Sequence, residues 1–281
     1  MPATPLAVTG STGRLGGRVA RRLAAAGVPQ RLLVRDPARA PDLPGAAVVR
    51  APYGDGAAVR AALEGVDTVL LVSASETPDR VAQHRTAVDA AADAGVAHLV
   101  YVSFLGAAPD ATFTLARDHW ATEEHVRARG LTATFLRDSL YADFVPALVG
   151  EDGAIRGPAG EGRVAPVAQD DVADVAVAVL RDPAAHAGRT YDLTGPRALT
   201  LAEVAEVLSA ATGRAVRYVP ETVAEAYASR ASSGAPDWQV EAWVSTYTAV
   251  AAGEMDVVSP AVPDLLGRPA RPLAEVLGAP S

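Results

Sequence analysis

The amino-acid sequence predicts an α/β fold, a Rossmann-like doubly wound parallel sheet with a smaller α/β lobe towards the C-terminus. Three observations support this prediction. Apolar runs alternate with amphipathic helical stretches through the first half of the chain. A glycine-rich turn joins the first apolar run to the first helical stretch. The strand-like runs are apolar almost throughout, as strands covered on both faces are. Parallel strands need crossovers, which the helical stretches supply.

The first half of the chain contains the elements of this sheet. The predicted strands share short apolar runs and are residues 5–9, 31–34, 46–49, 67–74, 97–103 and 131–137. The predicted helices share apolar residues at helical spacing and are residues 14–26, 56–64, 79–94 and 114–129. Gly95 and Gly130 follow the last two helices and are expected to end them.

The second half of the chain has a looser pattern. It contains a Gly/Pro-rich loop with a strand pair, and elements at 169–180 (helix), 189–195 (strand), 198–213 (helix) and 215–219 (strand), then a tail that is Pro-rich over 260–272. Thr200 and Glu203 are spaced as a capping box, and Gly213 is expected to stop that helix. The predicted dinucleotide-binding domain is 1–140 with 163–195 returning to it, and the lobe is 141–162 and 196–281.

The composition excludes several classes of function. The 281 residues carry a formal net charge of -8 and no Lys/Arg-rich block, which argues against a nucleic-acid partner. No run of eighteen apolar residues is present, so no membrane span is expected. The first residues lack the pattern of a secretory signal, and the chain has no cysteine, so a cytoplasmic location is expected.

One further absence narrows the chemistry. All 25 basic residues are arginine, so lysine chemistry such as a Schiff base or a P-loop lysine is excluded. Without cysteine there is no thiol nucleophile and no thiolate metal site, and we expect no metal centre.

The stretch "VTGSTGRLGGRV" (8–19) places Gly10, Gly13 and Gly16 three residues apart. A turn from strand to helix must lack Cβ atoms where a pyrophosphate approaches the backbone, and the helix N-terminus then offers N–H groups and a partial positive charge. Glycines also end strands for structural reasons alone, but here a strand precedes them and an amphipathic helix follows. The loop therefore predicts a dinucleotide site.

The residues after the second predicted strand indicate which dinucleotide is preferred. An acidic residue there would bind a ribose 2′-hydroxyl, whereas arginine would meet a 2′-phosphate. Arg35 follows the strand directly, with Asp36, Arg39 and, in the glycine loop, Arg14 nearby. We expect NADP(H) to be preferred over NAD(H), the alternative being that Arg35 and Arg39 are merely solvated.

Several stretches together resemble a known family. In their order along the chain they resemble the NmrA-like branch of the short-chain dehydrogenase/reductase superfamily. Within it they are similar to the bacterial NADPH-dependent quinone oxidoreductases of type 2 and the triphenylmethane reductases. The resemblance runs from the first strand to the "LLGRPARPLAEVL" tail. Its stretches include "VTGSTGRLGGRV", "LLVRDPARA", "QHRTAVDAAADAGVAHLVYVS", "HWATEEHVRARG" and "TFLRDSLYADF".

The resemblance implies roles for particular residues. Arg35 would meet the adenosine phosphate, and Ser103 and Phe104 would lie near the nicotinamide. The residues that would run beside the ribose and pyrophosphate are Ser73, Ala74 and Ser75. The residues that would hold the pyrophosphate are Gly10, Ser11, Thr12, Gly13, Arg14 and Leu15.

Typical members of the superfamily carry a Tyr and a Lys four residues apart on the helix after the fifth strand. By the same resemblance, Leu115 and His119 occupy those positions here. His119 would hydrogen-bond the nicotinamide ribose. Ketone reduction needs an acid to protonate the developing alkoxide, whereas a quinone delocalises the charge and takes its proton later. The missing pair therefore favours a quinone-like acceptor.

Other side chains have two interpretations each. Tyr141 could donate a proton at the rim of the pocket or simply pack, and Asp138 stands where similar proteins tend to have Asn. Trp238, with Trp243 and Tyr247, could wall the pocket of an aromatic acceptor or pack against the main domain. His119 and Glu123 have a metal-ligand spacing, but no third ligand is in view.

The sequence thus predicts an NADPH-dependent reductase of a quinone or similar small conjugated acceptor, with no flavin or metal. A cofactor-binding redox sensor without turnover would also lack the Tyr–Lys pair, so this alternative stays open. A reductase of secondary metabolism is the third interpretation. The oligomeric state is not readable from the sequence, and a homodimer is left open.

Overall fold

The computed structural model describes residues 6–278, so Pro5, the first residue of the predicted strand 5–9, lies outside the described residues. The fold divides into two compact units. The first comprises the chain up to Ser103, Asp118–Arg137 and Val172–Tyr191. The second comprises Phe104–Arg117, Asp138–Asp171 and the chain from Asp192 on.

A seven-stranded sheet has the strand order β3-β2-β1-β4-β5-β6-β9. Pairing is parallel for β1 with β2, β2 with β3, β1 with β4 and β4 with β5. This is the doubly wound order, whose direction reverses between β1 and β4, and it confirms the predicted fold class. The strands are β1 (Leu6–Thr9), β2 (Gln30–Val34), β3 (Ala46–Arg50), β4 (Thr68–Val72), β5 (His98–Phe104), β6 (Thr132–Asp138) and β9 (Thr190–Leu193).

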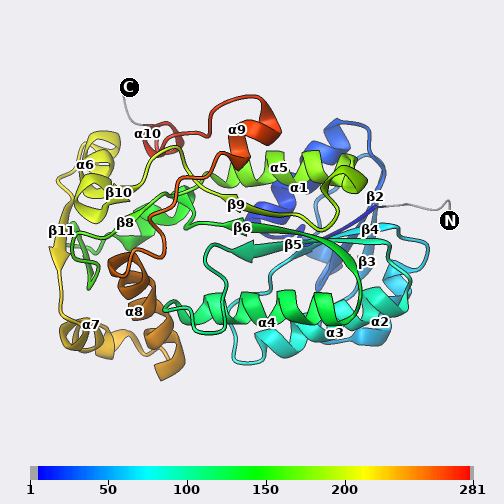
Figure 1. Cartoon of the computed structure of the whole chain (residues 1–281), viewed down its shortest axis with the longest axis horizontal. Helices are drawn as coiled ribbons and strands as arrows, with labels where there is room; N and C mark the ends of the chain where they lie inside the picture. The colour runs from blue at the N-terminus through cyan, green and yellow to red at the C-terminus, as the bar shows by residue number, and fades with distance from the viewer. Residues whose placement is uncertain (1–5, 279–281) are drawn as a thin grey trace. The chain divides into compact units, whose positions relative to one another are not determined.

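Helices cover both faces of this sheet. Figure 1 shows α1 and α5 on one face and α2, α3 and α4 on the other. The helices are α1 (Arg14–Ala25), α2 (Gly56–Leu63), α3 (Arg80–Asp93), α4 (Thr114–Ala128) and α5 (Gln169–Arg181), with short 3-10 turns η1 (Pro37–Arg39) and η3 (Pro183–His186). Helix α1 buries the predicted face of Leu15, Val19 and Leu23. Every strand and helix predicted before residue 140 is present, within two residues at each end.

Four short strands form two small sheets apart from the large one. β7 (Ala154–Gly157) pairs in parallel with β11 (Arg217–Pro220), and β8 (Arg163–Val164) pairs antiparallel with β10 (Leu199–Thr200). The expectation of a strand pair inside the loop 150–167 is therefore wrong. Both strands form there, but each takes its partner from beyond residue 198, which local sequence cannot reveal.

The helices of the second unit have clear local signals. They are η2 (Ala142–Leu148), α6 (Leu201–Thr212), α7 (Val223–Arg230), η4 (Ala231–Ser233), α8 (Asp237–Ala251), α9 (Ala261–Leu266) and α10 (Leu273–Val276). The capping box of Thr200 and Glu203 is confirmed, and Gly213 ends α6 with φ at 67°. Helix α6 begins at Leu201 rather than at residue 198, because the two preceding residues form β10.

The Pro-rich tail is tied down by a buried carboxylate. Asp171, at the start of α5, is fully buried and accepts hydrogen bonds from the backbone N–H and the guanidinium of Arg271. Arg268 adds an ion pair at 2.8 Å. Charge pairing of this kind is what allows a carboxylate to be buried. Within the described range, no helix combines the length and the apolar character needed to cross a membrane.

Candidate functional site

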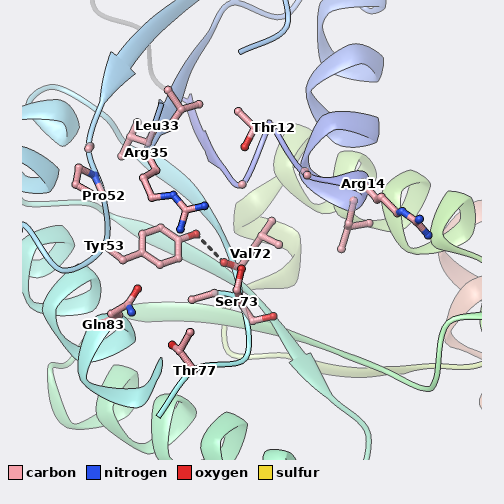
Figure 2. A pocket seen from close by; sticks show the side chains of 18 residues that line it. Thr12, Arg14, Leu33, Arg35, Pro52, Tyr53, Val72, Ser73, Thr77 and Gln83 are labelled. Atoms are coloured by element: carbon pink, nitrogen blue, oxygen red, sulfur yellow. Dashed lines mark hydrogen bonds between the residues drawn. The ribbon is translucent and has the colours of Figure 1, made fainter. Parts of the chain in front are cut away.

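A pocket of about 270 Å³ lies in the first unit where β1, β2 and β4 end. This is the carboxyl edge of the sheet at the point where the strand order reverses, the place where doubly wound folds bind ligands. Figure 2 shows the residues around it. The lining residues are Gly10, Thr12, Gly13, Arg14, Leu15, Gly16, Leu33, Val34, Arg35, Ala51, Pro52, Tyr53, Val72, Ser73, Ala74, Ser75, Thr77 and Gln83.

The glycine loop is shaped by contacts that only glycine permits. Gly10 has φ at 65°, and its carbonyl accepts a hydrogen bond from the N–H of Gly13 at 2.9 Å. A Cβ on Gly16 would lie 2.4 Å from the Gly10 carbonyl oxygen. Since real Cβ atoms do not approach so closely, Gly16 lets α1 start directly against the turn.

The N-terminus of α1 points at this pocket with its positive end uncompensated by acidic side chains. Its N-cap residue is Gly13, which has no side chain to cap the helix, and the first turn contains no acidic residue. A helix start of this kind attracts anions through its N–H groups and dipole. Ser11, in the same loop, is buried, and its Oγ has no hydrogen-bond partner. The loop therefore suits a phosphate group.

The three arginines predicted near a 2′-phosphate differ in their positions. Arg35, directly after β2, points across the pocket towards Tyr53, whereas Arg14 points away from it (Figure 2). Arg39 lies in η1, is exposed, and is not among the residues that line the pocket. Asp36 caps η1 by accepting from the Ala38 N–H at 3.1 Å. Arg35 is thus the cation best placed to meet an anionic ligand.

Tyr53 is a pocket residue that sequence reasoning did not identify. Its hydroxyl donates to the Val72 carbonyl oxygen at 2.6 Å and is hydrogen-bonded to the hydroxyl of Thr9. Burial raises the pKa of Tyr53, so the phenol keeps its proton. Tyr53 follows β3, whose end lies at the same edge of the sheet. Ligands bind at the carboxyl ends of parallel strands, so the residues that follow β3 were also candidates for the pocket.

The segment after β4 contributes the predicted Ser73, Ala74 and Ser75 to the lining. Thr77 and Gln83, which the predicted site does not include, line the pocket as well, and Gln83 lies on α3. No local signal marks these two side chains, because the loop after β4 and the packing of α3 bring them to the pocket.

Ser103 and His119 bond to protein groups of the first unit. The Ser103 Oγ donates to Glu123 Oε1 at 2.7 Å. Arg80 Nη2 lies 2.9 Å from His119 Nε2, and the Tyr101 hydroxyl lies 3.0 Å from its Nδ1. A guanidinium can only donate, so Nε2 is the acceptor and Nδ1 carries the proton. Burial lowers the pKa of His119 well below its usual range, so the ring is neutral.

Glu123 is held by arginines. Arg137 contacts both carboxylate oxygens, at 2.8 and 2.7 Å, and Arg127 adds a bond at 3.0 Å. His119 and Glu123, although four residues apart on α4, therefore bond to different partners: His119 to Arg80 and Tyr101, and Glu123 to Ser103 and the two arginines. Across residues 6–278, no group of three or more His, Asp or Glu side chains is arranged to hold a metal ion.

The remaining predicted residues belong to the second unit. The Tyr141 hydroxyl donates to Asp138, which is buried, and its ring packs on Phe144 with centroids 5.9 Å apart. The Phe104 ring contacts Phe113, with centroids 4.8 Å apart. Trp238 is half-buried in the first turn of α8. Further along α8, Trp243 packs against a small core of α7 and α8, and Tyr247 packs in the main core of the second unit.

Comparison with known proteins shows which family this chain matches. The model of the NmrA-like family matches residues 3–239. The NAD(P)H azoreductase of Xenophilus azovorans is 37% identical over 274 residues, which are 95% of each chain. The (4-alkanoyl-5-oxo-2,5-dihydrofuran-3-yl)methyl phosphate reductase of Streptomyces griseus is 38% identical over 275 residues, again 95% of each chain.

One solved structure is similar to this chain in both fold and amino-acid sequence. The crystal structure of the NADPH-dependent quinone oxidoreductase 2 of Escherichia coli, complexed with NADPH, superposes with a TM-score of 0.88. It is 34% identical, and the match covers 97% of this chain and 98% of that one. The strand order, the glycine loop and these matches over almost the whole length lead to one conclusion: the chain belongs to the NmrA-like family.

Proposed function

We propose that this chain is an NAD(P)H-dependent oxidoreductase that prefers NADP(H) and reduces a quinone or a similar small conjugated acceptor. The observation that carries the proposal is the pocket at the reversal point of the sheet, where the glycine loop and Arg35 lie on one surface. The three similar proteins described above are all reductases, and two of them are named for NADPH or NAD(P)H.

The residues present suit a dinucleotide phosphate. The bare backbone from Gly10 to Gly16 and the uncapped start of α1 would hold the pyrophosphate, and Arg35 the 2′-phosphate. Ser73, Ala74 and Ser75 would follow the ribose and pyrophosphate. When bound, the reduced nicotinamide supplies a hydride. The protein's part is to bind, orient and exclude water.

Conjugated acceptors fit the side chains better than simple ketones do. The chain has no lysine, and His119 is neutral with both ring nitrogens hydrogen-bonded to protein. No Tyr–Lys pair therefore stands ready to protonate an alkoxide. The similar proteins are named for an azo compound, a quinone and an oxo-dihydrofuran, each of which has conjugated unsaturation. Such an acceptor spreads the incoming charge over several atoms.

A hydrogen-bonded polar pair is proposed to contact the acceptor. Tyr141 and Asp138, joined by a hydrogen bond, form this pair, with Trp238 proposed as an aromatic neighbour of the acceptor and Phe104 proposed to lie near the nicotinamide. We propose that His119 does not donate a proton to the acceptor and instead acts by holding the Arg80 guanidinium, which is hydrogen-bonded to its Nε2.

Oxidation of NADPH by the purified protein tests the proposal. Binding of NADPH and NADH is first measured by fluorescence, and oxidation is then followed with a benzoquinone, a naphthoquinone, an azo dye and an unsaturated lactone phosphate. Acceptor-dependent oxidation, faster with NADPH than with NADH, is the expected result. Tight NADPH binding without turnover on any acceptor would instead indicate a cofactor sensor, and absence of binding would refute the assignment of the glycine loop.

A further inference from the structure

The segment 73–77 borders the pocket after it has left the sheet. Strand β4 ends at Val72, and residues 73–77 belong to no strand or helix. Outside helices and strands, main-chain N–H and C=O groups pair with side chains or with water. The partners of this segment therefore decide how firmly it is held.

Both main-chain groups of Ala74 are bound by side chains of α3. His84 Nε2 accepts from the Ala74 N–H at 2.8 Å, and Arg80 Nε donates to the Ala74 carbonyl oxygen at 3.1 Å. Arg80 and His84 lie four residues apart, which places them one above the other on one helix face. Both are buried, His84 completely. We name this arrangement the Ala74 clamp, formed by Arg80 and His84.

The clamp histidine is fixed by a relay of hydrogen bonds. Because its Nε2 accepts from a main-chain N–H, the proton of the neutral ring must lie on Nδ1. Nδ1 then donates to the Thr122 hydroxyl at 2.9 Å, which in turn donates to the Asp118 carbonyl oxygen at 2.8 Å. Each donor in the series from the Ala74 N–H through His84 and Thr122 has an acceptor, so the His84 ring has one orientation and one tautomer.

The guanidinium of the clamp arginine, Arg80, is itself hydrogen-bonded to His119. Arg80 Nη2 donates to His119 Nε2 at 2.9 Å, and the opposite ring nitrogen of His119 meets the Tyr101 hydroxyl at 3.0 Å. The carboxylate of Asp118 lies 3.7 Å from Arg80 Nη1. His119 is thereby an acceptor that holds the guanidinium in place.

Val72 is bound in the same manner as Ala74. The Thr9 hydroxyl accepts from the Val72 N–H at 2.9 Å, and the Tyr53 hydroxyl donates to the Val72 carbonyl oxygen at 2.6 Å. Side chains thus bind the main-chain groups of two alternate residues, one on either side of Ser73. Ser73 and Ser75, which line the pocket, therefore lie on a main chain that these hydrogen bonds fix in place.

We propose that Arg80 and His84 are positioning residues for the dinucleotide, which act by holding Ala74 and so fix the segment 73–77 in the shape that receives the cofactor. The proposal rests on the proposed function, since it assumes that the pocket binds NADP(H). When a binding segment is correctly shaped for only a fraction of the time, apparent affinity falls by that fraction. Loss of one clamp bond is therefore expected to raise the Kd for NADPH by about tenfold.

The test compares matched histidine variants. His84→Phe keeps the ring volume but removes the acceptor, and His84→Gln restores an acceptor near the position of Nε2. The control is His98→Phe. His98 is also buried and bonds to a threonine hydroxyl, Thr134 Oγ1 at 2.8 Å, which donates to a main-chain carbonyl. It stands at the first residue of β5, so it lies at the opposite edge of the sheet from the pocket.

His84→Phe is expected to raise both the Kd and the KM for NADPH about tenfold, with kcat at saturating NADPH within about twofold of wild type. The Kd ratio of NADH to NADPH should not change, because the 2′-phosphate contacts are untouched. His84→Gln should recover most of the affinity, and His98→Phe should lower the thermal stability with the Kd unchanged. Equal NADPH affinity in His84→Phe and wild type would overturn the proposal.

Two measurements on the wild-type protein keep the proposal testable if His84→Phe does not fold. Long-range proton–nitrogen NMR should show His84 and His119 as neutral Nδ1–H tautomers at neutral pH, and the Ala74 amide should exchange slowly without cofactor. Fast exchange of that amide, or the other tautomer of His84, refutes the clamp. Failure of the wild-type protein to bind NADPH at all would refute the proposed function instead.

Discussion

Arg137 binds both carboxylate oxygens of Glu123 inside the first unit, through Nε to Oε1 at 2.8 Å and Nη2 to Oε2 at 2.7 Å. Glu123 is completely buried, and the Ser103 hydroxyl donates to the same carboxylate at 2.7 Å. Ser103 therefore has its proton committed to Glu123, and towards any ligand it offers only an acceptor oxygen.

Glu123→Gln is expected to lower the free energy of unfolding by about 3 kcal/mol, because it leaves the Arg137 guanidinium without its counter-charge. Urea denaturation at neutral pH measures this. The neighbouring Glu124→Gln is the control. Glu124 pairs with Arg127 on the surface, so this change should stay within about 0.5 kcal/mol. Equal effects of the two variants would contradict the interpretation.

Arg35→Ala is expected to raise the Kd for NADPH by about 10- to 100-fold and to leave the Kd for NADH within about twofold. The reason is that a hydrogen-bonded ion pair to the 2′-phosphate is worth roughly 1.5–3 kcal/mol. Fluorescence titration of both cofactors measures it. Arg39→Ala, outside the pocket lining, should change neither Kd by more than about twofold. Equal losses for NADPH and NADH in Arg35→Ala would remove Arg35 as the reader of the phosphate.

Gly16→Ala is expected to destabilise the protein by about 1–3 kcal/mol and to abolish tight NADPH binding. The added Cβ would lie 2.4 Å from the Gly10 carbonyl oxygen and must push the turn away from α1. The matched control is Gly54→Ala, where a Cβ meets no atom within 4 Å. Thermal unfolding and NADPH titration of the two variants make the comparison, and a Gly16→Ala protein that binds as wild type does would contradict the role of the loop.

The buried histidines predict how stability depends on pH. Burial lowers the pKa of His84 to about 3, and it also lowers the pKa values of His98 and His119. Below about pH 6.5 the unfolded chain binds protons on these rings more readily than the folded chain does, so the stability that they contribute is lost as the pH falls. His84 alone contributes a slope of about 1.4 kcal/mol per pH unit between roughly pH 6 and pH 5, because its ring stays neutral in the folded protein over this range.

Urea denaturation at several pH values checks the sign and the size of this slope. His84→Gln removes one of the three rings and should reduce the slope by about 1.4 kcal/mol per pH unit. A stability that rises on acidification over this range would mean that the rings are charged in the folded protein.

Tyr141→Phe is expected to lower kcat/KM for the acceptor by about fivefold, since it removes one hydrogen bond from the polar pair with Asp138. The Kd for NADPH should stay within about twofold, because neither residue lines the described pocket. Steady-state kinetics with varied acceptor at saturating NADPH separate the two effects. A change confined to the Kd of NADPH would move this pair to the cofactor site.

The elements of the large sheet, the glycine loop and the capping box of Thr200 with Glu203 could all be predicted from the amino-acid sequence. Each of these depends on residues that are neighbours along the chain, so periodicity, turn chemistry and spacing are enough to read them. The same holds for Arg35, which directly follows a strand whose end could be predicted.

Which side chains from separate elements meet could not be predicted, because it depends on how the elements pack. The Tyr53 hydroxyl bonds to the Val72 carbonyl oxygen although two strands lie between β3 and β4 in the sheet. The short strands β7 and β8 pair with β11 and β10, which come much later in the sequence. His119 illustrates the limit most clearly. Its identity was visible in the sequence, but its tautomer depends on Arg80, thirty-nine residues earlier and on another helix. Which ring nitrogen carries the proton follows from what lies beside it in space, and the folding of distant segments against one sheet sets those neighbours.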